Sequence, residues 1–326
     1  MKPVILCSIV LFSTFSFGID ILKKENQKSY VINVSTTVEH WGMGDSETDL
    51  FLAYLKSNEY QQCQDKKIDD RAEVTPLGRV GDSCIYYRIP LGRKQAFGKK
   101  AVFYNSFELE TFDVAVDFEA IGAIKPYDVC DPNYAVNIGS DLPFINVEHP
   151  ALYKISEAIW QESEDILDYA EKCYLLVAKQ FEYGERESGF KSLNYTLLNR
   201  KGDCGNLSSV FITLLRMQGI PARHLMGFRP DGSLHVWSDF YLQDYGWIPV
   251  DVTYKHDYPE GDYFGKIKFE HNGFIVQRGI GHQIDVLEFP KRITGLQTYT
   301  YQVSYTKEHH AKVYISRKVE CVEIGG

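Results

Sequence analysis

Two features are scarce in this sequence: clustered basic residues and long apolar runs. Its 35 Lys and Arg residues are outnumbered by 44 Asp and Glu, and the formal net charge is -9. Binding to nucleic acid or to an anionic membrane requires a basic face, so neither is expected as the main partner. After residue 18, no segment approaches the ~18 unbroken apolar residues of a membrane span. We therefore expect no stable membrane insertion of the mature chain.

Cysteine is also thinly spread. The 7 cysteines include no pair in C-x-x-C spacing, which argues against a zinc site, and they form no dense disulfide framework. A bridge between Cys63 and Cys84 is compatible with the sequence but not required by it. Asp257, Glu260 and Asp262 lack the spacing of a calcium loop and are interpreted as a solvated turn. We predict no metal and no cofactor.

The amino terminus has the pattern of a secretory signal peptide. One positive charge at Lys2 precedes the uncharged stretch 4–17, and Ser16 and Gly18 supply the small residues of a cleavage site after Gly18. The stretch is short for a membrane span, although an uncleaved anchor or a buried helix remains an alternative. Cleavage predicts an exported protein, periplasmic or extracellular. Six cysteines would remain: Cys63, Cys84, Cys130, Cys173, Cys204 and Cys321.

Strand-like alternation dominates residues 29 to 120. Apolar and polar residues alternate over 30–38 and again over 112–119, which is typical of strands with one buried and one solvated face. An antiparallel β-sandwich is the expected closure for such strands. Residues 19–150 are therefore predicted to form a β-rich, sandwich-like domain, with an irregular proline-containing connector from about residue 125.

Helical spacing begins after residue 150. Apolar residues from 166 to 181 follow helical steps, and Cys173 lies on their buried face, where we expect it to act as a small core hydrophobe. A second helix has Asp203 as N-cap and Gly219 at its C′ position, with Pro221 beyond. Strands are then predicted at 223–228, 235–242 and 247–251. Residues 151–290 are thus predicted to form an α+β core, and residues 291–326 to form C-terminal strands.

Cys204 is the candidate nucleophile. At the first turn of a helix it meets the positive end of the peptide dipoles and unpaired N–H groups, which favour a thiolate and can also hold an oxyanion. Gly202 and Gly205 are expected to leave room for a substrate backbone. The negative charge of Asp203 opposes the thiolate unless that side chain is engaged in capping. Tyr195 and Asn199 are weak candidates for an additional oxyanion donor.

His235 and Asp251 are the candidate partners of this thiol. A thiolate needs a base, and a carboxylate on the other imidazole nitrogen fixes the tautomer. In a hairpin with a regular four-residue loop at 243–246, Asp251 would face Ser238, on the opposite side from His235. The triad therefore requires a bulge or a loop with an odd number of residues. We predict a break in regular pairing at Pro249, which cannot donate a ladder hydrogen bond.

Several ordered motifs resemble the transglutaminase-like superfamily. They are Gly202-Asp203-Cys204-Gly205, Leu214-Leu215-Arg216, Gly219-Ile220-Pro221-Ala222-Arg223, His235-Val236-Trp237 and Trp247-Ile248-Pro249-Val250-Asp251-Val252-Thr253. The resemblance covers roughly residues 155–255 and implies a papain-like α+β fold with Cys204, His235 and Asp251 as catalytic triad. Many members have a proline where this chain has Val252, and a small residue where it has Val236. A β-rich region followed by this core also resembles exported bacterial members.

The resemblance implies thiol-dependent acyl transfer on peptide or isopeptide amide bonds, through a thioester on Cys204. The superfamily includes cross-linking enzymes, peptidases, amidases and inactive members. Because an exported enzyme meets ample water, hydrolysis of a protein or peptide substrate is favoured over cross-linking. A catalytically silent binding or scaffold protein is the alternative, and a metal enzyme using Cys204 and His235 as ligands ranks last. Trp237 and Trp247 are interpreted as packing behind the triad, and Arg223 as an ion-pair anchor.

Overall fold

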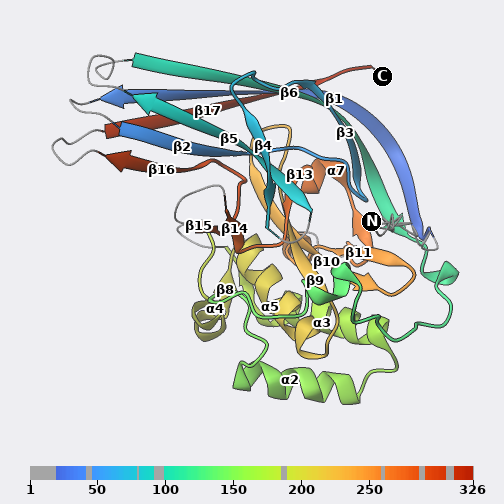
Figure 1. Cartoon of the computed structure of the whole chain (residues 1–326). Coiled ribbons are helices and arrows are strands. Elements are labelled where there is room, and N and C mark those ends of the chain that lie inside the picture. The colour runs from blue at the N-terminus through green and yellow to red at the C-terminus, as the bar shows by residue number, and fades with distance from the viewer. Residues whose placement is uncertain are drawn as a thin grey trace, which may run out of the picture.

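The computed structural model describes residues 20–41, 46–78, 81–91, 99–184, 189–257, 261–285, 291–305 and 312–325 (Figure 1). The predicted signal peptide, residues 1–18, lies outside these ranges, as does Glu260 of the predicted solvated turn. Within them, every helix is too short or too polar to span a bilayer.

Two antiparallel sheets form the upper layers in Figure 1. The first has the order β12-β6-β1-β17, with β3 also paired to β6. Its strands are β1 (Leu22–Trp41), β3 (Gln61–Lys67), β6 (Lys99–Val116), β12 (Lys266–Ile267) and β17 (Lys312–Glu323). The second has the order β16-β2-β5-β4. Its strands are β2 (Ser46–Ala53), β4 (Glu73–Leu77), β5 (Asp82–Leu91) and β16 (Thr300–Tyr305).

The alternation seen in the sequence decides how these sheets pack. On β1, the side chains of Tyr30, Ile32 and Val38 are buried, whereas their neighbours are partly or fully exposed. They share one core with residues of the second sheet, including Leu50 and Tyr87. The predicted β-sandwich is confirmed. The later alternation continues along β6 only to Val116, and Phe118 already belongs to the short helix η1 (Phe118–Ala120).

The carboxyl-terminal strands complete the sandwich. β17 pairs with β1 from Tyr30↔Glu323 to Trp41↔Lys312. β16 pairs with β2 in the other sheet. Residues predicted only as C-terminal strands after residue 291 therefore share sheets with strands from the beginning of the chain. A long β1 leaves backbone donors and acceptors on both of its edges, and β6 and β17 satisfy them.

The other half of the molecule packs helices on a third antiparallel sheet, below the sandwich in Figure 1. This sheet has the order β11-β10-β9-β13. Its strands are β9 (Ala222–Phe228), β10 (Leu234–Leu242), β11 (Gly246–Val250) and β13 (Phe274–Arg278). The main helices are α2 (Pro150–Gln161), α3 (Ile166–Gln180) and α5 (Cys204–Met217). The predicted α+β arrangement is confirmed.

Short elements connect these layers. The helices among them are α1 (Pro132–Ala135), α4 (Leu193–Asn199), α6 (Tyr254–Asp257) and α7 (Phe269–Asn272), and the strands are β7 (Glu182–Tyr183), β8 (Lys201–Gly202), β14 (His282–Ile284) and β15 (Lys291–Ile293). Helix α5 is central because it contacts α2, α3, α4, β9 and β10. Nearly all of its residues are buried, which fixes the position of its amino-terminal end.

The two halves are joined by side chains that cross between them. The Gln61 amide both donates to the carbonyl of Ile275 and accepts from its N–H, each at 2.9 Å. The rings of Phe269 and Tyr30 lie 5.2 Å apart within the sandwich core. The sandwich and the helical half therefore share buried contacts rather than only a linker.

The six described cysteines are unbonded to one another. Cys63 donates from its sulfur to the carbonyl of Leu55 at 3.3 Å, and Cys84 is buried in a different cluster. The bridge between Cys63 and Cys84 that the sequence left open is therefore not formed. Cys173 is fully buried on α3, and burial raises the pKa of its thiol to about 12, which agrees with a core role.

Candidate active site

Cys204 is the first residue of α5, and its side chain is partly exposed. Asp203 caps the helix: one carboxylate oxygen accepts from the N–H of Asn206 at 3.1 Å, and the other accepts from the N–H of Gly189 at 2.9 Å. The carboxylate is thus engaged in capping, which is the condition under which its charge opposes a thiolate least. The N–H groups of Cys204 and Gly205 find no acceptor among the described residues.

The glycines beside Cys204 serve packing rather than substrate access. A Cβ atom on Gly202 would lie 2.6 Å from the Cβ of Asn206, and one on Gly205 would lie 2.9 Å from the ring of Phe190. The space in front of both glycines is therefore already filled by the protein. The expectation that they leave room for a substrate backbone is wrong, because the close approach is intramolecular.

His235 lies at the start of β10 and links the thiol to a carboxylate. Its Nε2 is 2.7 Å from Oδ2 of Asp251, and its ring lies close enough to Cys204 for the two side chains to interact. Since Nε2 faces Asp251, Nδ1 is the nitrogen left for the sulfur. Burial opposes the charged ring, but the charge and hydrogen bond of Asp251, together with Cys204, raise the pKa of His235 to about 9. The imidazolium form is therefore favoured at neutral pH.

The strand register explains how His235 and Asp251 meet. Leu242 pairs with Gly246, so the hairpin loop has three residues and Ser238 pairs with Val250. Continuing this register places Asp251 opposite Trp237, on the face of the sheet that also carries His235. The sequence required either a bulge or a loop with an odd number of residues, and the structure has the loop.

The break predicted at Pro249 is wrong. Pro249 pairs in register with Asp239. Its carbonyl faces away from β10 and accepts from the N–H of Gly265 at 2.8 Å, so the missing N–H, which lies on the same side, breaks no hydrogen bond between β10 and β11.

Asp251 is held by more donors than His235 alone. Its Oδ1 accepts from the N–H and the hydroxyl of Thr253, at 3.0 and 2.7 Å, and from the N–H of Tyr254 at 3.3 Å. Its Oδ2 also accepts from the Asn272 amide at 2.8 Å. Burial works against ionisation, yet the charge of His235 and these hydrogen bonds hold the pKa of Asp251 below its ordinary value.

Sequence reasoning missed Asn272. It lies at the end of α7, 21 residues after Asp251 and beyond the motifs that pointed to the site. It is fully buried between Phe269 and Phe274, both of which pack into the sandwich core. An amide flanked by buried aromatic residues is a signal of a buried hydrogen bond. The sequence could not identify the partner, since only the tertiary structure brings α7 to Asp251.

Aromatic side chains enclose His235. The Trp237 ring is stacked on the imidazole with 5.6 Å between ring centres, and the Tyr254 ring meets its edge at 5.3 Å. The packing role predicted for Trp237 is confirmed. These rings restrict how the imidazole can turn, so its two nitrogens stay directed at the sulfur and at the carboxylate.

Arg223 is the ion-pair anchor expected from the sequence. It forms two hydrogen bonds to Asp239, both 3.0 Å long, and a longer one of 3.3 Å to Glu59. Its guanidinium group lies over the ring of Trp247, 3.6 Å from the centre. Arg223 and Asp239 are both buried, so the pair is a structural feature of the sheet.

The two weak oxyanion candidates lie on α4. The Asn199 amide donates to the carbonyl of Tyr195 at 2.7 Å, so it is used within its own helix. The Tyr195 side chain is exposed, and the described residues give it no contact with the site. The described ranges also contain no group of three or more His, Cys, Asp or Glu side chains placed to hold a metal ion.

Comparisons with known proteins concern the same part of the chain. Residues 153–252 match the family model described as the transglutaminase-like superfamily. An uncharacterised protein of Haemophilus influenzae is 33% identical over a segment that covers 16% of this chain and 21% of that protein. The chain thus spans about a fifth of the length of that curated relative.

The likeness in fold extends over nearly the whole chain in one solved structure. A protein of Cytophaga hutchinsonii, described as a candidate cysteine protease, is 14% identical over 94% of this chain and 93% of its own, with a TM-score of 0.59. The periplasmic domain of TgpA from Pseudomonas aeruginosa is 15% identical over 64% and 74%, with a TM-score of 0.36. Residues 153–252 of this chain therefore match a transglutaminase-like core, in which the helix that begins at Cys204 packs on an antiparallel sheet, and the β-sandwich is built from strands on both sides of this core in the sequence.

Proposed function

We propose that the chain is a thiol-dependent acyl-transfer enzyme acting on peptide or isopeptide amide bonds. Cys204 is the nucleophile, His235 is the general acid and base, and Asp251 orients and stabilises the imidazolium. The observation that carries this proposal is the 2.7 Å contact between His235 and Asp251, with Cys204 close enough to the imidazole to interact with it. A nucleophile, a base and an orienting group in this order are what covalent catalysis at a carbonyl requires.

The reaction follows from the positions of these groups. The thiolate attacks the amide carbonyl, a C–S bond forms, and negative charge moves to the carbonyl oxygen. The N–H groups of Cys204 and Gly205, which have no acceptor among the described residues, are available to bind that oxygen. As the C–N bond breaks, the His235 imidazolium donates its proton to the leaving amine, which leaves a thioester on Cys204. A second nucleophile then gives its proton to His235 and releases the acyl group.

We favour water as that second nucleophile, which makes the enzyme a hydrolase. The Cys204 side chain is partly exposed, so water reaches the thioester without a second binding site, whereas cross-linking needs a bound amine. The Cytophaga hutchinsonii protein described as a candidate cysteine protease supports the choice of peptide bonds. The predicted signal peptide places this activity outside the cytoplasm.

The test is the pH dependence of Cys204 alkylation by iodoacetamide, followed by mass spectrometry of the peptide that contains it. We expect Cys204 to react with iodoacetamide at pH ~6 in the wild type. In His235→Ala this low-pH labelling should slow by at least roughly 10-fold, because the imidazolium no longer stabilises the thiolate.

Two controls make the result interpretable. Cys204→Ala gives the blank, and the exposed Cys130 gives an in-chain reference whose labelling should be the same in wild type and His235→Ala. If Cys204 labels no faster at pH ~6 than it does in His235→Ala, the paired thiolate is absent. A catalytically silent scaffold would then be the better account of the chain.

A further inference from the structure

A polar cavity lies at the carboxyl end of α5, the end remote from Cys204. Its volume is about 450 Å³, and it is lined by the connector around Asn137 and Asp141, by Arg216 and by the segment after β13 that includes His282. Because α5 has 14 residues, its two ends are about 20 Å apart. The cavity is therefore separate from the site around Cys204.

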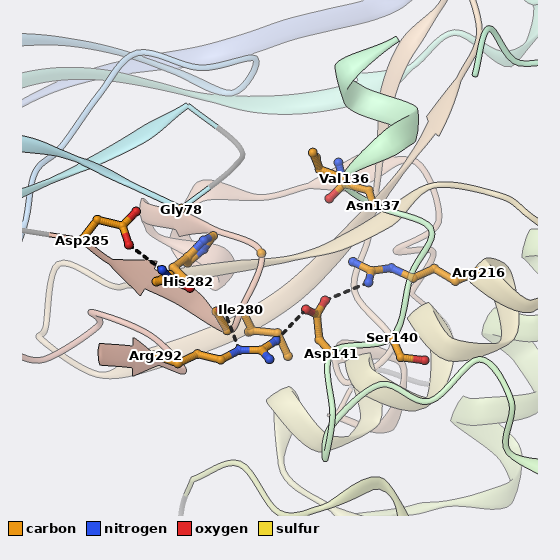
Figure 2. A pocket seen from close by; sticks show the side chains of 13 residues that line it. Gly78, Val136, Asn137, Ser140, Asp141, Arg216, Ile280, His282, Asp285 and Arg292 are labelled. Carbon is orange, nitrogen blue, oxygen red and sulfur yellow. Dashed lines mark hydrogen bonds and ion pairs between the residues drawn. The ribbon is translucent and has the colours of Figure 1, made fainter. Parts of the chain in front are cut away.

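Arg216 brings a buried positive charge to the cavity wall. Its side chain is only 2% exposed. Its Nε donates to the carbonyl of Ala222 at 2.7 Å, and its Nη1 donates to the carbonyl of Gly139 at 2.6 Å and to Asp141 at 2.9 Å. Its Nη2 has no partner among the described residues, and Figure 2 shows that end of the guanidinium directed into the space that the labelled side chains surround. This nitrogen is open to the cavity, which therefore offers it a place for an acceptor.

A second arginine shares the same counter-ion. Arg292 donates from Nη2 to the other oxygen of Asp141 at 3.1 Å, and from Nε to the carbonyl of Gly281 at 2.9 Å (Figure 2). Its Nη1 likewise has no partner in the described part of the chain. Two guanidinium groups on one carboxylate leave one positive charge uncompensated.

The other ionisable groups that line the cavity do not cancel the positive charge near the two arginines. Asp285 lies at the opposite end of the cavity from Arg216 in Figure 2, and its side chain is exposed, so solvent screens it. The His282 ring is largely buried, and burial lowers its pKa, which keeps it neutral near pH 7. Its Nε2 is 2.9 Å from the carbonyl of Arg278.

We propose that this cavity binds a small oxyanion, a carboxylate or a phosphate group, between Arg216 and Arg292. Arg216 is oriented by three hydrogen bonds and Arg292 by two, and each presents a nitrogen without a partner among the described residues, an arrangement that suits paired hydrogen bonds to carboxylate or phosphate oxygens. The site is held by three segments distant in sequence: the connector, α5 and the hairpin of β14 and β15. Binding is therefore expected to stabilise the folded chain.

The test uses the full chain, with inorganic phosphate and acetate titrated separately against chloride at constant ionic strength. Isothermal calorimetry should give saturable binding of at least one anion below about 20 mM. Saturation by phosphate alone assigns a phosphoryl ligand, and saturation by acetate assigns a carboxylate ligand. Arg292→Gln should weaken that binding by roughly 10-fold or more, because one charged donor is removed.

Arg71→Gln is the matched control, since Arg71 is a similarly exposed arginine that is paired with Asp69 on the sandwich. It should leave anion binding unchanged, and so should Cys204→Ala, which makes the result independent of the proposed catalysis. Arg216→Lys tests whether the planar guanidinium with its paired N–H donors is needed. The substitution keeps the positive charge and should still weaken anion binding several-fold. Absence of saturable binding for both anions, or equal binding by wild type and Arg292→Gln, would overturn the proposal.

Discussion

Strand β10 contributes to two buried charged clusters that use similar groups for different ends. At its start, His235 pairs with Asp251 and also contacts the partly exposed Cys204. Four residues further on, Asp239 pairs with Arg223, which also reaches Glu59. The second cluster, called the closed cluster below, continues from Glu59 to Arg278 and contains no nucleophile, whereas the first, the open cluster, ends on a cysteine that solvent can reach. The comparison indicates that a buried ion pair becomes chemically useful when one partner lies beside an accessible nucleophile rather than beside a further ion pair.

The largest effect on stability is expected in the closed cluster. Asp239→Ala leaves the buried Arg223 with the longer ion pair to Glu59 and the ring of Trp247. Removing one partner of a buried pair costs about 3–5 kcal/mol, because the other charge stays desolvated. Urea unfolding measures the loss. The matched control is Asp262→Ala, which breaks the exposed pair with Lys266 and should cost less than about 1 kcal/mol. Equal losses in the two variants would mean that the closed cluster is not a structural anchor.

The open cluster should make the folded chain less stable as the pH rises into the alkaline range. The pKa of His235 is raised on folding from an ordinary 6.5 to about 9. Its stabilising contribution is therefore fully present below pH 6.5 and is lost as the pH rises through about 9. The difference in unfolding free energy between wild type and His235→Ala should shrink by on the order of 3 kcal/mol from pH ~6 to pH ~10. A difference that does not vary over this range would contradict the imidazolium–carboxylate pair.

The smallest expected effect concerns the hydrogen bond by which Asn272 orients Asp251 in the open cluster. Asn272→Ala removes one of the donors to the Asp251 oxygen that faces His235. Loss of a partner that orients a functional side chain lowers activity roughly 10- to 100-fold. We expect the rate of Cys204 alkylation near pH ~6 to fall towards the lower end of that range.

Asn105→Ala is the control for that experiment, because Asn105 is a buried amide that bonds to Tyr87 inside the sandwich. It should reduce stability and leave the alkylation profile of Cys204 unchanged. If both variants change the profile equally, Asn272 acts only through general stability. If neither variant changes the profile, the hydrogen bonds from Thr253 and the backbone are sufficient to orient Asp251.

Local patterns predicted much of this architecture. The alternation over residues 30–38 predicted a strand with one buried face, and the structure buries Tyr30, Ile32 and Val38. The N-cap at Asp203 predicted where α5 begins, because capping depends on a short-range hydrogen bond. Errors arose where the deciding contact was distant, as for Gly205, where Phe190 fills the space.

The sequence by itself determined which residues are candidates for chemistry. A cysteine after a helix cap, and a histidine and an aspartate in strands of fixed spacing, follow from local preferences that operate over a few residues. Only the tertiary structure decided the three-residue hairpin loop, the approach of Asn272 to Asp251, and the return of β17 to pair with β1. Those contacts join segments far apart in the chain, and many alternative pairings would satisfy the same local patterns. Burial of the whole core selects among them.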